Sequence, residues 1–221
     1  LYLLTEETRF AGQAKHYAFE ECAYLEKSIP YFVNMWILLT PGRAISALYA
    51  YDMTRDSGVW SDSERRELKD TLSWCIDHYM NEGTDHIGTG FKYQTDYIPE
   101  DTANMNVHRL LAVGMYALIF PDDERSRELV DYTEKYFERI LSLGARAGGA
   151  WAENPRYAQG VLQKLFELAA GLKNRGHHNF FADERFKKML GFYAESIPVP
   201  GIESPHKPTM LGADDSHWWE N

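Results

Sequence analysis

Two polar segments, each followed by a hydrophobic pattern of helical period, carry the side chains best suited to binding an anion and moving a proton. The first supplies Asn104 and His108, which stand four residues apart and would share one helix face, so that an amide and an imidazole could point at one ligand. The second supplies the carboxylate of Glu153, the guanidinium of Arg156 and the phenol of Tyr157. Together these groups offer donors, positive charge and acid–base capacity, which general acid–base catalysis requires.

An internal repeat of 60 residues indicates how these segments are positioned. An aromatic residue, three helix-starting residues, glutamate and arginine recur at 60–65, 120–125 and 180–185. Each copy opens an amphipathic helix: Ser61 and Glu64 have the spacing of a capping box, and Asp122 or Asp123 is the predicted cap of the second copy. The repeating unit is therefore predicted to be a pair of helices whose second member has one apolar face.

The first helix of each predicted pair is apolar on nearly all sides. Residues 107–120 show this most clearly, and residues 44–53 and 157–172 have a similar character, rich in alanine and leucine. Such helices are normally buried on both sides, so we expect inner helices surrounded by outer amphipathic ones. No stretch alternates convincingly with a period of two residues, and strands are expected to be minor or absent. The predicted fold is all-α, an incomplete (α/α) toroid of repeated helical hairpins.

The connections from outer to inner helices are long and are expected to carry the function. They cover residues 83–103, 144–153 and 198–217. Because every inner helix is predicted to run the same way, all three should emerge at one end of the fold, and loops of this length are usually functional. Both polar segments belong to that end.

Composition excludes several classes of partner. Asp and Glu number 33 against 23 Lys and Arg, and the resulting formal charge of −10 argues against nucleic acid or an anionic membrane as a partner. An anionic ligand would need a local basic pocket. Nothing in the sequence approaches the 18 or more consecutive apolar residues of a membrane span. Cys22 and Cys75 are too few for a disulfide framework and too far apart for a metal motif, so both are predicted to be core residues, and no metal or cofactor is expected.

Length and shared period favour a single domain over residues 1–221. The sequence begins at Leu1 without a methionine and ends inside what reads as a loop, so we expect it to be a piece of a longer protein.

Three motifs, in order, resemble the helical domain of heparinase II/III-like and alginate-lyase-like polysaccharide lyases. The resemblance covers roughly residues 42–172. The motifs are Tyr51-Asp52 with Gly58, Ser61 and Glu64-Arg65; Asn104-x-Asn106 before a hydrophobic helix; and Gly148-Gly149-x-Trp151-x-Glu153-x-Pro155-x-Tyr157. The sequence departs from the family at Met105, where several relatives have histidine, and at Gly148-Gly149, where Asp-Gly is common.

The resemblance implies an activity and roles for particular residues. Tyr157 matches the family's proton-transferring tyrosine, and Asn104 matches the asparagine that, often with a histidine, neutralises a uronate carboxylate. His108 is predicted to be catalytic with them because of its spacing from Asn104. The implied partner is an anionic polysaccharide or oligosaccharide, without a cofactor, and the implied location is periplasmic or secreted. A further histidine often comes from a following β-sheet domain, which the resemblance implies for the longer protein.

The chemistry of β-elimination explains why these residue types are needed. The C5 proton of a uronate is a very weak acid, so donors must hold the carboxylate as negative charge develops on it. Asn104, Arg109 or Arg156 could do so. Tyrosine titrates near pH 10, and Arg146 and Arg156 could lower the pKa of Tyr157. The remaining predicted substrate-binding residues are Asn106 and Glu153, with the aromatics Trp151, Tyr93 and Tyr97 as stacking surfaces for sugar rings.

Each candidate also has a structural interpretation. Asn104 is a favoured N-cap, His108 could be a satisfied core histidine, Glu153 could interact with a helix dipole or with Arg156, and Tyr157 could cap the core. Two other functions stay open on the same fold. One is glycoside hydrolysis by Glu153 paired with Asp101 or Glu100, and the other is a non-catalytic scaffold that binds glycan or protein.

Overall fold

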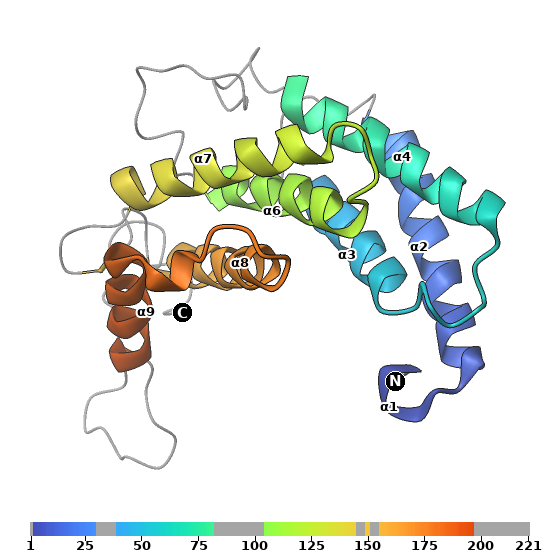
Figure 1. The fold of residues 1–221 in the computed structure, drawn as a ribbon, viewed down its shortest axis with the longest axis horizontal. Helices are drawn as coiled ribbons and strands as arrows, with labels where there is room; N and C mark the ends of the chain where they lie inside the picture. Colours follow the sequence, from blue (N-terminus) through green and yellow to red (C-terminus); the bar gives the residue numbers. More distant parts are fainter. Residues whose placement is uncertain (1, 30–38, 82–103, 145–148, 151–154, 197–221) are drawn as a thin grey trace, which may run out of the picture. The chain divides into compact units, whose positions relative to one another are not determined.

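The protein is built from α-helices. The computed structural model describes residues 2–29, 39–81, 104–144, 149–150 and 155–196, and in these ranges no strand occurs (Figure 1), which confirms the all-α prediction. The helices are α1 (Tyr2–Thr5), α2 (Thr8–Ser28), α3 (Leu39–Asp52), α4 (Asp62–Asn81), α6 (Asn104–Ile119), α7 (Ser126–Gly144), α8 (Pro155–Asn174) and α9 (Glu184–Ser196), with a short 3-10 helix η2 (Phe180–Ala182). Within the same ranges, none of the helices has both the length and the apolarity needed to span a bilayer.

The chain divides into two compact units. The first contains Leu1–Thr95 and His108–Thr133, and the second contains Asp96–Val107 and Glu134–Asn221. The division passes through α6 and α7, so the start of α6 and the end of α7 belong to the second unit.

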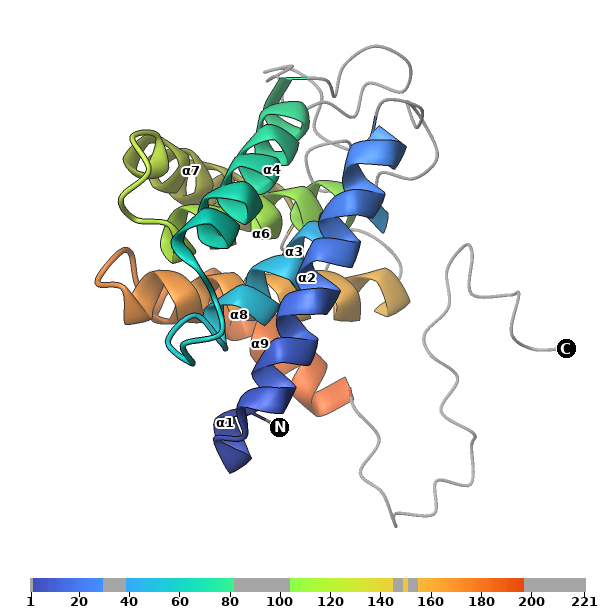
Figure 2. The same ribbon diagram turned by 90° about the vertical axis from the view of Figure 1, so that its right-hand side faces the viewer.

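In the first unit, α2 packs against both α3 and α4 (Figure 2). The apolar face predicted for the outer helix α4 is confirmed, because Leu68, Leu72, Cys75, Ile76 and Tyr79 are all buried. Cys22 of α2 and Cys75 are 4% and 0% exposed, as expected of core cysteines.

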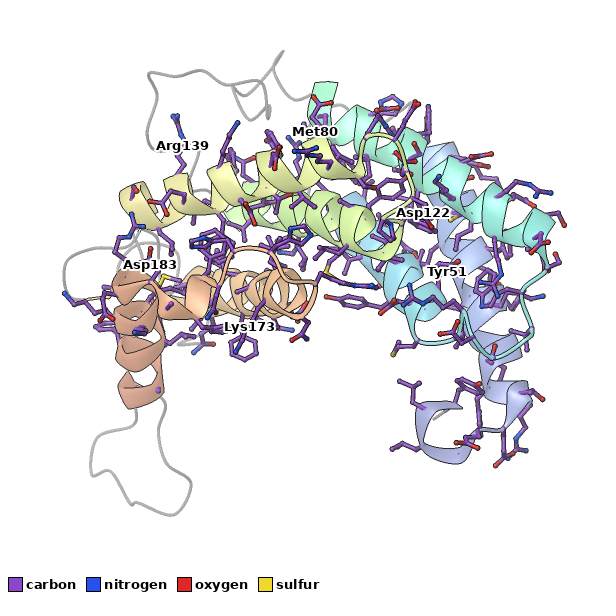
Figure 3. All side chains as sticks on the ribbon, viewed as in Figure 1. Tyr51, Met80, Asp122, Arg139, Lys173 and Asp183 are labelled. Carbon is purple, nitrogen blue, oxygen red and sulfur yellow. The ribbon has the colours of Figure 1, made fainter. Side chains whose placement is uncertain are left out.

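The inner helices α3 and α6 are buried around most of their circumference. From position 106 to the end of α6, only His108 and Met115 keep a partly exposed side chain. In α3, Tyr51 stacks on Phe120 with ring centroids 5.1 Å apart and meets Trp60 edge-on at the same distance (Figure 3). The prediction of helices buried on both sides is therefore confirmed for these two.

The third predicted inner helix, α8 in the second unit, is less buried than expected. One face is inside, formed by Ala158, Val161, Leu165, Leu168, Ala169 and Leu172. On other faces, Phe166 is 49% exposed and Gln163 and Lys173 are exposed to solvent. The helix is thus amphipathic, because polar residues interrupt the alanine and leucine pattern. The core of this unit includes Phe137 of α7 stacked on Phe180 of η2, with centroids 3.9 Å apart.

The repeated signature marks the turns that lead into the outer helices. Its aromatic residues Trp60, Phe120 and Phe180 are 5%, 8% and 1% exposed. The predicted capping box is present: the Ser61 amide donates to Glu64 Oε2 at 2.8 Å, and the Glu64 amide donates to Ser61 Oγ at 3.3 Å. The helix of the first copy begins directly after Ser61, at Asp62, and the helix of the third copy begins at Glu184.

The prediction for the second copy was wrong, because α7 begins only at Ser126. Neither Asp122 nor Asp123 is its N-cap. The Asp123 carboxylate accepts hydrogen bonds from the Tyr116 hydroxyl at 2.9 Å and the Arg125 amide at 3.0 Å, and it pairs with Lys69 Nζ at 3.1 Å. These contacts hold residues 121–125 in a turn, and the helix starts after it.

Each outer helix is joined to the preceding one by an ion pair at an equivalent place. The partners are 49, 48 and 47 residues apart: Lys15–Glu64 between α2 and α4, Asp77–Arg125 between α4 and the turn before α7, and Glu138–Arg185 between α7 and α9. The first pair has the opposite charge order from the other two. The near-constant separation follows the 60-residue repeat of the sequence.

Candidate functional site

Three residues are predicted to be catalytic, Asn104, His108 and Tyr157, and two of them occupy the first turn of a helix. Asn104 is the first residue of α6, and Tyr157 is the third residue of α8, which begins with Pro155, a residue favoured at this position. Both belong to the second unit. Their backbone positions agree with the prediction that the polar segments lead directly into these helices, whereas their side chains lie outside the described part of the structure.

His108 lies four residues after Asn104 in the same continuous helix. Residues at this spacing share a helix face, so the predicted pairing of an amide and an imidazole is compatible with α6. The His108 side chain is half-buried. Its role beside Asn104 stays a prediction.

Asn106 and Arg109 place two buried polar side chains near the start of α6. Their exposed fractions are 2% and 6%, and the buried residues that follow them in the helix are apolar. A buried guanidinium is costly unless it is paired or hydrogen-bonded, so its burial is a specific feature of this end of the helix. Both residues were predicted to bind substrate, and here they lie inside the protein.

The positive charge of Arg109 acts on Tyr79, a buried tyrosine that was not among the predicted site residues. Burial raises the pKa of Tyr79 well above its usual value, while the neighbouring Thr40 side chain and the positive charge of Arg109 act in the opposite direction. Tyr79 and Thr40 are 6% and 8% exposed. The three residues come from the end of α4 and the starts of α3 and α6, where the long connections attach. A phenol with a raised pKa is suited to donating a hydrogen bond and poorly suited to acting as a base.

Gly149, from the glycine-containing motif before α8, has a backbone conformation that requires glycine. Its φ of +91° is a conformation that L side chains rarely adopt, and a Cβ at this position would lie 2.3 Å from the Lys188 backbone oxygen. The backbone at Gly149 therefore lies directly against α9, which leaves no room for a side chain.

The other predicted site residues are not tested by the structure. Four of them lie outside the described residues: Tyr97, Arg146, Trp151 and Glu153. The same is true of Glu100 and Asp101, the possible partners of Glu153 in a hydrolase. Only the backbone of Arg156 is described. Among the described residues, no group of three or more His, Cys, Asp or Glu side chains is placed to hold a metal ion.

Comparison of the chain with protein-family models, curated proteins and solved structures gave no match.

Proposed function

We propose that the helical hairpins form part of an (α/α) toroid and that the chain is the helical catalytic domain of a polysaccharide lyase that acts on a uronate-containing glycan. The observation that carries this proposal is the placement of Asn104 and Tyr157 in the first turns of α6 and α8. The three recurring ion pairs between successive outer helices support the repeated-hairpin architecture.

In the proposed reaction, the Tyr157 phenolate removes the proton from C5 of the uronate. The electron pair of the C5–H bond forms the C4–C5 double bond, and the bond from C4 to the glycosidic oxygen breaks. The leaving oxygen takes a proton, which the newly protonated Tyr157 can supply. Asn104 donates hydrogen bonds to the uronate carboxylate as negative charge develops on it, with His108 on the same helix face as a second donor.

The backbone position of Tyr157 supports its proposed role as a base. The N-terminal turn of α8 carries the positive end of the helix dipole, which stabilises a negative charge placed there. Arg156 and Arg146 are close in sequence and add positive charge. Tyr79 differs in this respect, because burial raises its pKa and disfavours the phenolate. Tyr157 is therefore the better base of the two.

The proposal is tested by incubating the protein with polysaccharides of glucuronate, galacturonate, mannuronate and guluronate and following the ultraviolet absorbance of an unsaturated uronate product. The wild type is compared with Tyr157→Phe, and Tyr2→Phe serves as the matched control because Tyr2 lies on the short helix α1. We expect product from the wild type and the control, and a loss of about 100-fold or more in kcat for Tyr157→Phe, in the range of a lost general acid–base group.

Retention of activity in a folded Tyr157→Phe variant would remove this residue from the mechanism. Absence of an unsaturated product from every uronate polymer with the folded wild type would overturn the proposed lyase activity.

A further inference from the structure

A polar and aromatic cluster on α2 and α3 has features of a ligand site that the proposed reaction does not use. It consists of Tyr17, Glu21 and Tyr24 on α2 with Arg43 and Ser46 on α3, and we call it the Arg43 cluster. Residues 17, 21 and 24 are spaced by four and three positions and so follow one face of α2, which packs against α3 (Figure 2).

The guanidinium of Arg43 is held rigidly from two sides. Its Nη1 donates to Oε2 of Glu21 at 2.8 Å, and its central carbon lies 3.8 Å from the centroid of the Tyr24 ring. The Glu21 side chain is only 7% exposed, so a buried carboxylate fixes the orientation of the arginine from beneath. An arginine held in this way loses little side-chain entropy when it binds a further partner.

One edge of the guanidinium remains available. The Arg43 side chain is 38% exposed, and among the described residues its ion pair with Glu21 through Nη1 is the only one it makes. Nε and Nη2 together form the edge that binds a planar carboxylate through two parallel hydrogen bonds. Because a guanidinium carries five N–H donors, it can hold Glu21 and a second carboxylate together.

The cluster also contains an exposed aromatic ring. Tyr17 is 44% exposed and stands four residues before Glu21, so the two side chains share one face of α2. Exposed tyrosines present a flat apolar face with a polar rim, a combination that stacks on the apolar faces of sugar rings. The ligand that fits both features is a ring that carries a carboxylate.

We propose that the Arg43 cluster is a binding subsite for a uronate residue, in which Arg43 binds the carboxylate through Nε and Nη2 and Tyr17 packs against the sugar ring. The choice of a sugar as the carrier of the carboxylate rests on the proposed function, whereas the preference for a carboxylate follows from Arg43 itself.

The proposal is tested by isothermal titration calorimetry of the full chain carrying Tyr157→Phe, which prevents turnover. The probes are short oligomers of glucuronate, galacturonate, mannuronate and guluronate, each with its neutral counterpart. We expect at least one oligouronate to bind and its neutral counterpart to bind at least about tenfold more weakly, the factor for losing hydrogen bonds to a charged group.

Variants separate binding from folding. Arg43→Gln should weaken oligouronate binding by about 10- to 100-fold, whereas Arg66→Gln, an exposed arginine on α4, should leave it unchanged. Glu21→Gln should keep or tighten binding, because it removes a competing carboxylate while its amide oxygen can still accept from Arg43. Tyr17→Ala should weaken binding by about 2- to 10-fold through loss of the ring. Circular dichroism shows that each variant is folded.

Equal losses in Arg43→Gln and Glu21→Gln would make the cluster purely structural and overturn the proposal. Equal binding of the neutral oligomers, or no binding of any oligouronate, would also overturn it. A carboxylate-dependent complex that requires Arg43, in a protein that yields no unsaturated product, would support the subsite while refuting the lyase activity, so the two proposals fail separately.

Discussion

The contacts of Glu64 predict a pH-dependent contribution to stability that can be measured. Glu64 Oε1 accepts from Lys15 Nζ at 2.6 Å, and Oε2 accepts from both the amide and the hydroxyl of Ser61 at 2.8 Å. A single side chain therefore closes the capping box of α4 and joins α4 to α2. Glu64→Gln removes the charge but keeps the size and an amide oxygen.

The hydrogen bond with Lys15, followed by those with Ser61, lowers the pKa of Glu64 from 4.5 to about 2. Each pKa unit corresponds to about 1.4 kcal/mol, which gives an upper bound of about 3.4 kcal/mol. The side chain is 32% exposed, and solvent screening reduces that figure to about 1–2 kcal/mol, similar to the loss of a helix cap. Because the folded pKa is the lower one, the contribution is complete above pH 4.5 and is lost as the pH falls towards 2.

The assay is urea unfolding followed by circular dichroism at pH 7, 4.5 and 3. Glu64→Gln should be less stable than the wild type by about 1–2 kcal/mol at pH 7, and the difference should shrink as the pH falls. Glu67→Gln, an exposed glutamate on the same helix, is the matched control and should change stability by less than about 0.5 kcal/mol. Equal stability of the two variants at pH 7, or a Glu64→Gln deficit that is as large at pH 3 as at pH 7, would refute the reasoning.

Three further predictions follow from the core and the backbone. Phe180→Ala should lower the free energy of unfolding by about 3–5 kcal/mol in urea titrations, because the ring is 1% exposed, and a loss below about 1 kcal/mol would contradict its place in the core. Gly149→Ala should destabilise by about 1–3 kcal/mol and lower the thermal midpoint, since its Cβ would collide with the Lys188 carbonyl; an unchanged midpoint would show that the turn differs. Cys22 and Cys75 should resist a disulfide reagent until urea unfolds the protein, because burial raises the pKa of Cys22 to about 12 and that of Cys75 further; rapid labelling of the native protein would argue against this burial.

Local features of the fold could be predicted from the sequence with good accuracy. The capping box at Ser61 and Glu64 depends on residues three apart, and the apolar stripe of α4 depends on one helical period, so both can be read along the chain. The start of α7 could not be predicted in this way. Asp123 is held by Tyr116 and Lys69, and the Lys69 contact joins α4 to the turn before α7, which no local pattern encodes.

In the candidate site too, local features could be predicted from the sequence, whereas contacts between helices could not. The positions of Asn104 and Tyr157 at helix starts followed from the change between polar and apolar residues along the chain. The proximity of Tyr79 to Arg109 and the ion pair between Glu21 and Arg43 did not, because each joins residues on different helices. Tyr79 is the last residue of an apolar stripe, so its sequence context predicts a core residue and no function. Nothing in the sequence around Glu21 indicates that this glutamate is buried.

The chemical bond formed in the product tests the proposed function most directly. Mass spectrometry of the fragments released from the preferred uronate polymer distinguishes elimination from hydrolysis, because elimination leaves the new non-reducing end lighter by one water and unsaturated. We predict such fragments from the wild type and their loss in Tyr157→Phe. Saturated fragments that have gained a water would contradict the lyase assignment and favour the hydrolase that uses Glu153 with Asp101 or Glu100.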